Sequence, residues 1–342
     1  MDNQSHPENQ RSENSNTTLM EKRIHKTSSL ESYGCLIAVL LAILIILATT
    51  GNLVVCRLVW VCRRMQIPSF YFVASMSFSD FLMGLLVMPI SLGYHISYQT
   101  TGRWIFGHFT CNLWLFLNFI ACAASIYNLC VVSGDRYLAV TSPLNYLSRM
   151  NDRRVQQIIG VSWFCALALA SFVTYGTTVS TDNSVKCSIW GLRYEFSLVV
   201  FVAGYILPIL FLVFVNGKVI FIARAHLNRI HAQEISLATM SAVTEDAPGQ
   251  VPPRKTSQRS RLKREIKIFK TFLIITCTFL LSWTPFVVIL MIDSILTVPT
   301  LVRHSSIILL YCNSALNPFI YGYFNAEFRK ALTESFSCKC CT

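Results

Sequence analysis

The chain has 342 residues, of which 53% are hydrophobic and only 13% are charged, and its mean hydropathy is +0.50. Soluble domains carry about a quarter charged residues, so a chain this apolar cannot cover itself with polar surface and must use lipid as its solvent. A soluble protein is therefore excluded, and the net charge of +12 is interpreted as a membrane-topology signal rather than a nucleic-acid surface.

The N-terminal segment is polar. Residues 1–33 are rich in Asn, Ser, Glu and Lys, and no cleavable signal peptide is visible in them. We expect a disordered extracellular tail over 1–33 because such a composition cannot bury a core. Asn3 and Asn16 stand in Asn-X-Ser/Thr sequons, so both are candidate glycosylation sites.

Seven apolar runs follow the tail. Each approaches or exceeds the ~20 residues that a membrane-spanning helix requires. Runs of this length without two-residue alternation exclude a membrane β-barrel. We therefore predict an all-α fold, a seven-transmembrane helix bundle over 34–323. The predicted spans are 34–61, 69–94, 108–141, 154–177, 191–224, 265–294 and 302–323.

The positive charges set the orientation. Lys and Arg cluster at 63–64, 149–154, 254–270 and 329–330, which seven spans place on one side of the membrane. The positive-inside rule makes that side cytoplasmic. We thus expect a multi-pass plasma-membrane protein with an extracellular N-terminus and a cytoplasmic C-terminus. The longest loop, 225–264, is expected to be a flexible cytoplasmic linker.

Several polar side chains fall inside the predicted spans, where they are costly and indicate function. Asp80 is the only acid deep in a span. Carboxylate, amide and hydroxyl oxygens suit a small cation, although a neutral hydrogen-bonded network would use the same residues. The polar set is Asn52, Asp80, Ser125, Asn313, Ser314 and Asn317.

Two opposite charges lie at the predicted cytoplasmic face. Arg136 ends the third span and Glu265 begins the sixth. A pair across these helices would hold their ends together, and its rupture would let them separate; unrelated juxtamembrane charges are the alternative. Asn118 precedes Arg136 by 18 residues and Trp283 follows Glu265 by 18, about 27 Å along each helix. Asn118 and Trp283 are therefore expected at one depth.

A cavity open to the outside at that depth is the expected ligand site. Pro285 follows Trp283 by two residues and, lacking a backbone donor, permits a kink. A ligand pressing on Trp283 would then swing the inner half of the sixth helix. The expected lining is Asn118, Phe119, Cys122, Trp283, Phe286, Val287 and Tyr311.

Short motifs recur along the spans in a fixed order. Each is weak alone, but together they resemble the rhodopsin-like (class A) G-protein-coupled receptors over the helical part of the chain. The motifs are Gly51-Asn52, Ser79-Asp80, Asp135-Arg136-Tyr137, Trp163, Pro208, Trp283-Thr284-Pro285 and Asn317-Pro318-Phe319-Ile320-Tyr321.

The resemblance implies roles for particular residues. A disulfide would join Cys111 to Cys187. No cofactor is implied except an allosteric sodium ion, which would lie among Asp80, Ser125, Asn313, Ser314 and Asn317. The residues of G-protein coupling and switching would be Asp135, Arg136, Tyr137, Leu144, Glu265, Ile126, Pro208, Phe279, Pro285, Pro318 and Tyr321.

The C-terminal segment 324–342 resembles a short amphipathic eighth helix over 324–336 followed by palmitoylated cysteines. The palmitate would be carried by Cys338, Cys340 and Cys341. The resemblance also implies the partners: a small extracellular ligand, a heterotrimeric G protein, arrestin and receptor kinases, within a lipid bilayer and without nucleic acid.

The sequence from Ser314 to Leu332 is similar to the biogenic-amine branch of these receptors, but one residue elsewhere departs from that branch. Asn118 stands where that branch has an aspartate, and an amide supplies no charge to balance an ammonium. The positions of the fifth helix that often hold serines in that branch are Val200, Phe201 and Gly204, and its usual tryptophan three residues before Tyr311 is Ile308. Val200, Phe201 and Ile307 complete the expected ligand set.

The leading hypothesis is a receptor for a small, amine-like ligand, and the alternatives are a neutral or lipid-like ligand or constitutive signalling. Asn216, where an activation tyrosine is usual, leaves the strength of the active state open. A retinal photoreceptor would need a lysine in 304–323, which has none. An enzyme or a transporter would leave the tryptophan-proline pattern unexplained, so we expect no enzymatic activity.

Overall fold

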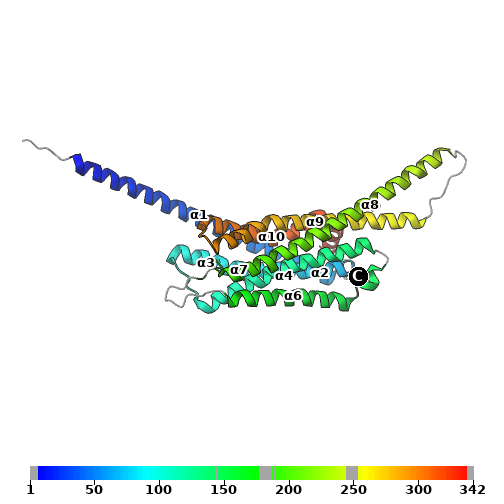
Figure 1. Ribbon diagram of the computed structural model, residues 1–342, viewed down its shortest axis with the longest axis horizontal. Coiled ribbons are helices and arrows are strands. Elements are labelled where there is room, and N and C mark those ends of the chain that lie inside the picture. The colour runs from blue at the N-terminus through cyan, green and yellow to red at the C-terminus, as the bar shows by residue number, and fades with distance from the viewer. Residues whose placement is uncertain are drawn as a thin grey trace, which may run out of the picture.

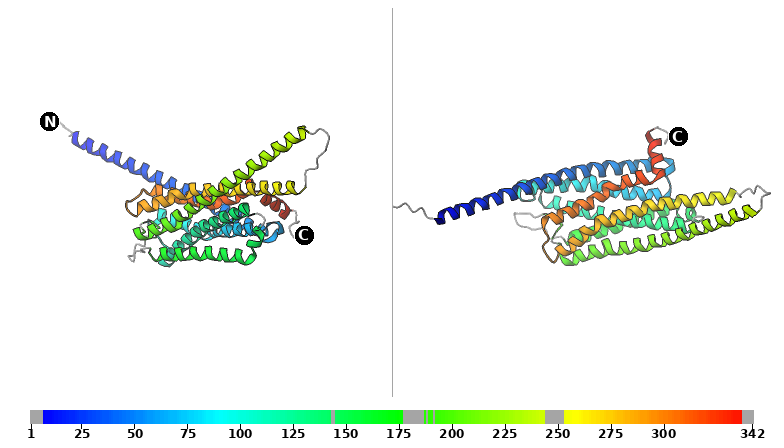
Figure 2. Two further views of the ribbon diagram at one scale, coloured as in Figure 1. Left: turned by 45° about the vertical axis from the view of Figure 1, so that its right-hand side comes forward. Right: turned by 90° about the horizontal axis from the view of Figure 1, so that it is seen from above.

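The computed structural model describes the backbone of most of the chain. The described residues are 7–142, 145–176, 187, 189–190, 192–243 and 253–336, with side chains except at 7–33, 147, 226–231, 233–268 and 336. Within them there are helices and no strand, which confirms the all-α prediction. Figures 1 and 2 show the long helices side by side in one bundle.

The first three long segments of the bundle are α1 (Pro7–Val61), the group α2 (Pro68–Leu82), η2 (Met83–Val87) and α3 (Met88–Thr101), and α4 (Gly107–Thr141). The connections hold the short helices η1 (Arg63–Met65) and α5 (Tyr146–Arg149). The others are α6 (Asp152–Tyr175), the group α7 (Tyr194–Phe201), η3 (Val202–Ile206) and α8 (Leu207–Val243), then α9 (Pro253–Asp293), α10 (Thr300–Phe324) and α11 (Ala326–Phe336).

Six helical segments are long and apolar enough to cross a membrane by themselves. The seventh, α10, is not among them, although it packs against α1, α2 and α9. Its mean hydropathy is lower because Asn313, Ser314 and Asn317 occupy its buried face. A membrane-spanning helix whose polar side chains face the interior of a bundle has a low mean hydropathy. The low mean hydropathy of α10 is therefore compatible with its being the seventh helix of the predicted bundle.

The helices extend beyond their apolar parts. The helix α1 begins at Pro7, inside the segment 1–33 for which the sequence predicts a disordered tail. The disorder of that segment stays a prediction. The sequence predicts a loop over 225–264, but in the structure α8 continues to Val243 and α9 begins at Pro253. Hydropathy locates the part of a helix that lies in lipid, whereas helix ends follow local propensity.

Two prolines coincide with widened helical turns. Pro89 and Pro208 lack the N–H that would pair with the carbonyl four residues earlier, which belongs to Leu85 and Gly204. Those residues lie in the five-residue π-turns η2 and η3. The wider turns therefore accommodate the prolines, at which the regular α-helical hydrogen bond cannot form.

The helix α4 occupies the centre of the bundle, because it contacts α2, α6, α8 and α9. Its two ends provide a reference for the rest of the molecule: we call them the Cys111 end and the Arg136 end. At the Arg136 end, α11 turns away from α10, as the right panel of Figure 2 shows. Asn325 caps α11 by accepting hydrogen bonds from the backbone of Glu327 and Phe328.

Candidate functional site

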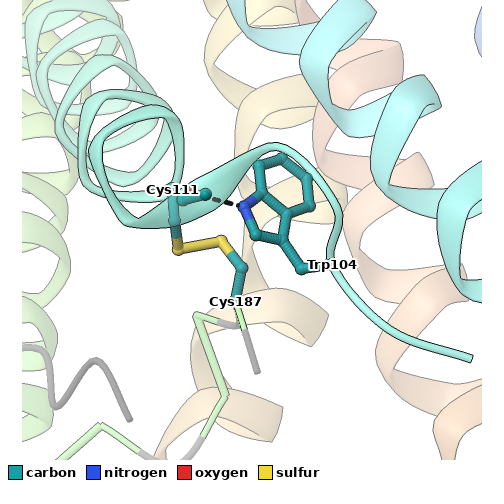
Figure 3. Close-up of a disulfide and its surroundings, with 4 residues drawn as sticks. Trp104, Cys111 and Cys187 are labelled. Atoms are coloured by element: carbon teal, nitrogen blue, oxygen red, sulfur yellow. Dashed lines mark hydrogen bonds between the residues drawn. A yellow bond between two sulfur atoms is a disulfide. The ribbon is translucent and has the colours of Figure 1, made fainter. Parts of the chain in front are cut away.

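A disulfide closes the Cys111 end. Cys111 in the first turns of α4 is bonded to Cys187, which confirms the predicted pairing (Figure 3). The indole of Trp104 lies beside the bridge and donates to the carbonyl of Gly107 at 2.7 Å. The bond fixes the segment around Cys187 and Ile189 to the central helix.

Asn118 is buried below that bridge, and its amide is engaged. Its Nδ2 donates to the hydroxyl of Tyr311 on α10 at 3.2 Å, and its Oδ1 accepts from the thiol of Cys122 at 3.4 Å. Asn118 and Tyr311 were predicted to line one site, and the structure brings them into contact. The contact is neutral, so it orients a polar group without supplying a charge.

The other predicted ligand residues converge on the same region. All are buried or half-buried members of one packed apolar cluster with Cys122 and Tyr311: Phe119, Val200, Phe201, Trp283, Phe286, Val287 and Ile307. Trp283 stacks on Phe279 at 4.7 Å between ring centres. The predicted floor of the site is therefore aromatic and contributed by α9.

Three residues that were not predicted from the sequence lie above this floor. Trp190 meets the ring of Phe286 edge to face at 5.7 Å. The guanidinium of Arg303 lies over Trp190 at 5.7 Å, and it is ion-paired with Asp293. Nothing in their local sequence marks these residues, because the contacts join a loop to the ends of two helices.

Asp80 lies in a polar centre between the two ends. Its carboxylate accepts hydrogen bonds from Asn317 at 2.7 Å, Ser314 at 2.8 Å and Ser125 at 3.3 Å. Asn52 adds its Nδ2, which donates to the carbonyl of Ser314 at 2.9 Å. Three of the four polar residues predicted around Asp80 therefore touch it, and they come from α4 and α10.

Amide oxygens in this centre are left without donors. The Oδ1 atoms of Asn52, Asn313 and Asn317 are buried and accept no hydrogen bond within the part of the chain that the structure describes. Asn317 contacts the Asp80 carboxylate and Asn52 contacts its partner Ser314, and carboxylate and amide oxygens are ligands that suit a small hard cation. The residues present therefore fit the sodium ion implied by the sequence resemblance.

The Arg136 end carries a second buried charge cluster. Arg136 Nη2 pairs with the Asp135 carboxylate at 2.6 Å, with both side chains nearly inaccessible. Tyr146 of α5 donates to the other Asp135 oxygen at 2.5 Å and also meets Ser69 of α2 at 3.1 Å. Burial raises the pKa of the Tyr146 phenol and the Asp135 carboxylate adds to the effect, so Tyr146 stays a proton donor.

The predicted pair between Arg136 and Glu265 is not tested, because the Glu265 side chain lies outside the described residues. The side chains of the other predicted residues Leu144, Asn3, Asn16, Cys338, Cys340 and Cys341 also lie outside the described residues.

Tyr137 packs at the edge of the small cluster formed by Val140, Val219 and Phe269.

The residues predicted to repack during switching are buried between the two ends. Ile126 and Phe279 are almost inaccessible, and Pro208 is buried beside Cys130, whose thiol lies 3.8 Å from the Pro208 carbonyl oxygen. Pro285 and Pro318 lie within α9 and α10. Tyr321 is buried against Phe272 and Phe328. Between Trp283 and Arg136, the printed ring contacts are the stack of Trp283 on Phe279 and the ring of Phe272, which meets Tyr321 and lies 5.8 Å from the Arg136 guanidinium.

Comparison with known proteins agrees with this arrangement. The family described as "7 transmembrane receptor (rhodopsin family)" matches residues 51–321. Trace amine-associated receptor 7e of Mus musculus is 32% identical over 84% of this chain and 78% of the relative. The 5-hydroxytryptamine receptor 1B of Vulpes vulpes is 28% identical over 94% and 91%. The octopamine receptor beta-2R of Chilo suppressalis is 27% identical over 88% and 80%.

Proposed function

Because the chain belongs to the rhodopsin family of seven-transmembrane receptors, whose members are receptors rather than enzymes, we propose that it binds a small extracellular ligand and activates heterotrimeric G proteins. An amine-like ligand is favoured, since the similar proteins are named for trace amines, 5-hydroxytryptamine and octopamine. The observation that carries the proposal is the continuous arrangement of Asn118, Trp283 and Asp135-Arg136 inside one bundle.

The Cys111 end is the extracellular end in this proposal. The basic residues of the connections gather at the opposite end, for example Arg63, Arg64 and Arg149, as the positive-inside rule requires of the cytoplasmic side. A disulfide between Cys111 and Cys187 suits an oxidising exterior. The receptor is thus a multi-pass plasma-membrane protein with an extracellular N-terminus.

The ligand is proposed to rest on Trp283 and Phe286 with a polar group at Asn118. An ammonium there would donate a hydrogen bond to the Asn118 amide oxygen but meet no carboxylate, which is a costly environment for a full charge. The neutral bond between Asn118 and Tyr311 at 3.2 Å specifically favours, as the second candidate, a neutral or lipid-like ligand. Constitutive signalling without a ligand is the third possibility.

Signal transfer would run along α9. A ligand that displaces Trp283 also displaces Phe279, since the two rings are stacked. Repacking of Phe279 against Ile126 and Pro208 would let the Arg136 end of α9 swing outward about the kink at Pro285. Arg136, released from Asp135, would then be exposed to the G protein, and the same open face would serve arrestin and receptor kinases.

A sodium ion at Asp80 would supply a positive charge that holds α2, α4 and α10 together. Asp80 and Ser125 would hold it, with the amide oxygens of Asn313 and Asn317 completing the set. Because these side chains lie together in the present arrangement, ion binding would favour it over the arrangement in which the Arg136 end of α9 has swung outward.

The test is ligand-stimulated dissociation of each G-protein class in cells, across a panel of primary amines. We expect at least one amine to activate one class, and Asn118→Asp to lower the concentration needed because it restores the counter-charge. Silence from every amine on the wild-type receptor, together with a response in Asn118→Asp, would exclude a native amine ligand. A response to neutral lipids instead would support the second candidate.

A further inference from the structure

A positively charged side chain reaches across the Cys111 end of the bundle. Arg303 begins the second turn of α10, and its ion pair with Asp293 ties it to the end of α9. It lies close enough to Tyr94 of α3 and to its neighbour His304 to act on both electrostatically. Its guanidinium face is covered by Trp190 at 5.7 Å. Arg303 is therefore held between the end of α9 and the segment after Cys187.

The position of Arg303 relates directly to the proposed ligand site. Arg303, Ile307 and Tyr311 are spaced four residues apart, so they follow one face of α10. Tyr311 is bonded to Asn118, and the eight residues from Tyr311 to Arg303 span about 12 Å of helix. The same Trp190 that covers Arg303 also packs on Phe286. A small molecule lying on Phe286 would thus have Asn118 at one end and Arg303 at the other.

The hydrogen-bonding capacity of Arg303 is only partly used. A guanidinium has five N–H donors, and the ion pair with Asp293 engages its Nη2. The Nε is buried and donates to none of the described residues. About a quarter of the side chain, 23%, remains exposed, whereas Asp293 is 2% exposed and also accepts from the Val298 backbone at 3.0 Å. Arg303 is accordingly the accessible member of the pair.

The surrounding charge favours an anion at this point. Among the described side chains, Asp293 is the only buried acid at the Cys111 end, and it is paired. The neighbouring titratable groups are Tyr94 and two imidazoles, His304 and His95, whose rings meet at 4.5 Å. These groups are neutral or cationic at physiological pH, so none of them competes with an incoming carboxylate.

We propose that Arg303 binds a carboxylate of the ligand, which makes the ligand a small molecule with a hydrogen-bonding or amine head at Asn118 and an acidic group at the opposite end. This inference rests on the proposed function for the site but narrows its ligand class. Asp293 orients the guanidinium, and Trp190 excludes water from one of its faces. A planar carboxylate matches the N–H groups of the Arg303 guanidinium that Asp293 does not engage, and removal of water strengthens the contact.

The test uses four probes with the full-length purified receptor: 2-phenylethylamine, its 4-carboxylate, the methyl ester of that acid, and 4-ethylbenzoate. Binding raises the melting midpoint by an amount that grows with the logarithm of the ratio of ligand concentration to Kd. We expect the 4-carboxylate to produce a given shift at a concentration roughly tenfold below that of its ester, as a charge-assisted bidentate pair would give. Arg303→Gln should abolish this preference.

Arg193→Gln is the matched control. Arg193 also has an acidic partner, Glu195 at 3.5 Å, and an aromatic neighbour, Phe196. However, its side chain is 61% exposed, and it lies at the start of α7, apart from the pair formed by Arg303 and Asp293. This variant should keep the carboxylate preference. Arg303→Lys keeps the charge and loses the fork, so it should retain part of the preference, and it carries the test if Arg303→Gln does not fold.

Equal binding of acid and ester by the wild-type receptor would overturn the inference, as would a preference that survives in Arg303→Gln or no shift with either carboxylate at millimolar concentration. Preference for plain 2-phenylethylamine, lost in Asp293→Asn, would instead assign an ammonium to Asp293. A G-protein response measured in parallel separates the two claims. Carboxylate binding without any response contradicts the proposed function alone, whereas amine responses without carboxylate preference contradict the inference alone.

Discussion

The hydrogen bond from Tyr146 to Asp135 offers a sharp perturbation of the Arg136 end. Tyr146→Phe removes only the hydroxyl and leaves the ring in place. Asp135 is buried, and its two oxygens are divided between Arg136 at 2.6 Å and Tyr146 at 2.5 Å. The substitution therefore takes one donor away from a buried carboxylate without opening a cavity.

The magnitude follows from the charge and burial of the acceptor. A hydrogen bond to a charged group contributes about 1.5–3 kcal/mol. That loss corresponds to a fall in melting midpoint on the order of 5 °C for a chain of this size. The bond belongs to the arrangement in which Asp135 holds Arg136, so its loss should also raise ligand-independent G-protein activation by about ten- to a hundredfold.

The assay compares purified wild-type, Tyr146→Phe and Tyr323→Phe receptors by thermal unfolding, and the same variants in cells by basal G-protein activation at matched surface expression. Tyr323 is the control, because it also lies near the Arg136 end but is 77% exposed and its hydroxyl makes no described hydrogen bond. A Tyr146→Phe receptor that matches the wild type in both measurements would refute the reasoning. An equal effect of Tyr323→Phe would show that the change is unspecific.

Three further predictions follow from other contacts. Replacing choline by sodium in the buffer should raise the melting midpoint of the wild-type receptor, and Asp80→Asn should remove this difference because the cation loses its carboxylate. Cys187→Ser should destabilise the receptor by about 2–5 kcal/mol, measured as reduced surface expression and a lower midpoint; wild-type values would show that the bridge is dispensable. Gly51→Ala places a Cβ 2.9 Å from Pro318 Cγ, so it should cost about 1–3 kcal/mol, whereas Gly160→Ala, with nothing within 4 Å, should be neutral or stabilising; equal midpoints would contradict this packing argument.

The sequence predicted the parts of the fold that depend on periodic or compositional signals. Six spans and the disulfide are confirmed, and Asn118 and Tyr311, which were both predicted to line the ligand site, are in contact. The seventh helix shows the limit of hydropathy. Its buried Asn and Ser residues lower the hydropathy, so the apolar run 302–323 was a weaker signal than the other six, and the motif around Asn317-Pro318 supported it.

Contacts between segments far apart in the chain were not predictable in the same way. Tyr146 sits in a connecting helix, and its bond to Asp135 depends on how that helix turns back toward α4. Trp190 and Arg303 meet because the disulfide and the end of α9 bring them together. The π-turns before Pro89 and Pro208 were also missed, because the sequence indicates a broken hydrogen bond but not whether the helix kinks or widens.

The most direct test of the receptor function is nucleotide exchange on purified heterotrimeric G proteins by the full-length chain in lipid vesicles. We predict exchange above that of receptor-free vesicles for at least one G-protein class, in the absence or presence of the 2-phenylethylamine series. Arg136→Ala, folded by the criterion of an unchanged melting profile, should reduce that exchange at least tenfold. Exchange that never exceeds the receptor-free rate, or that proceeds equally well in the Arg136→Ala receptor, would contradict the account.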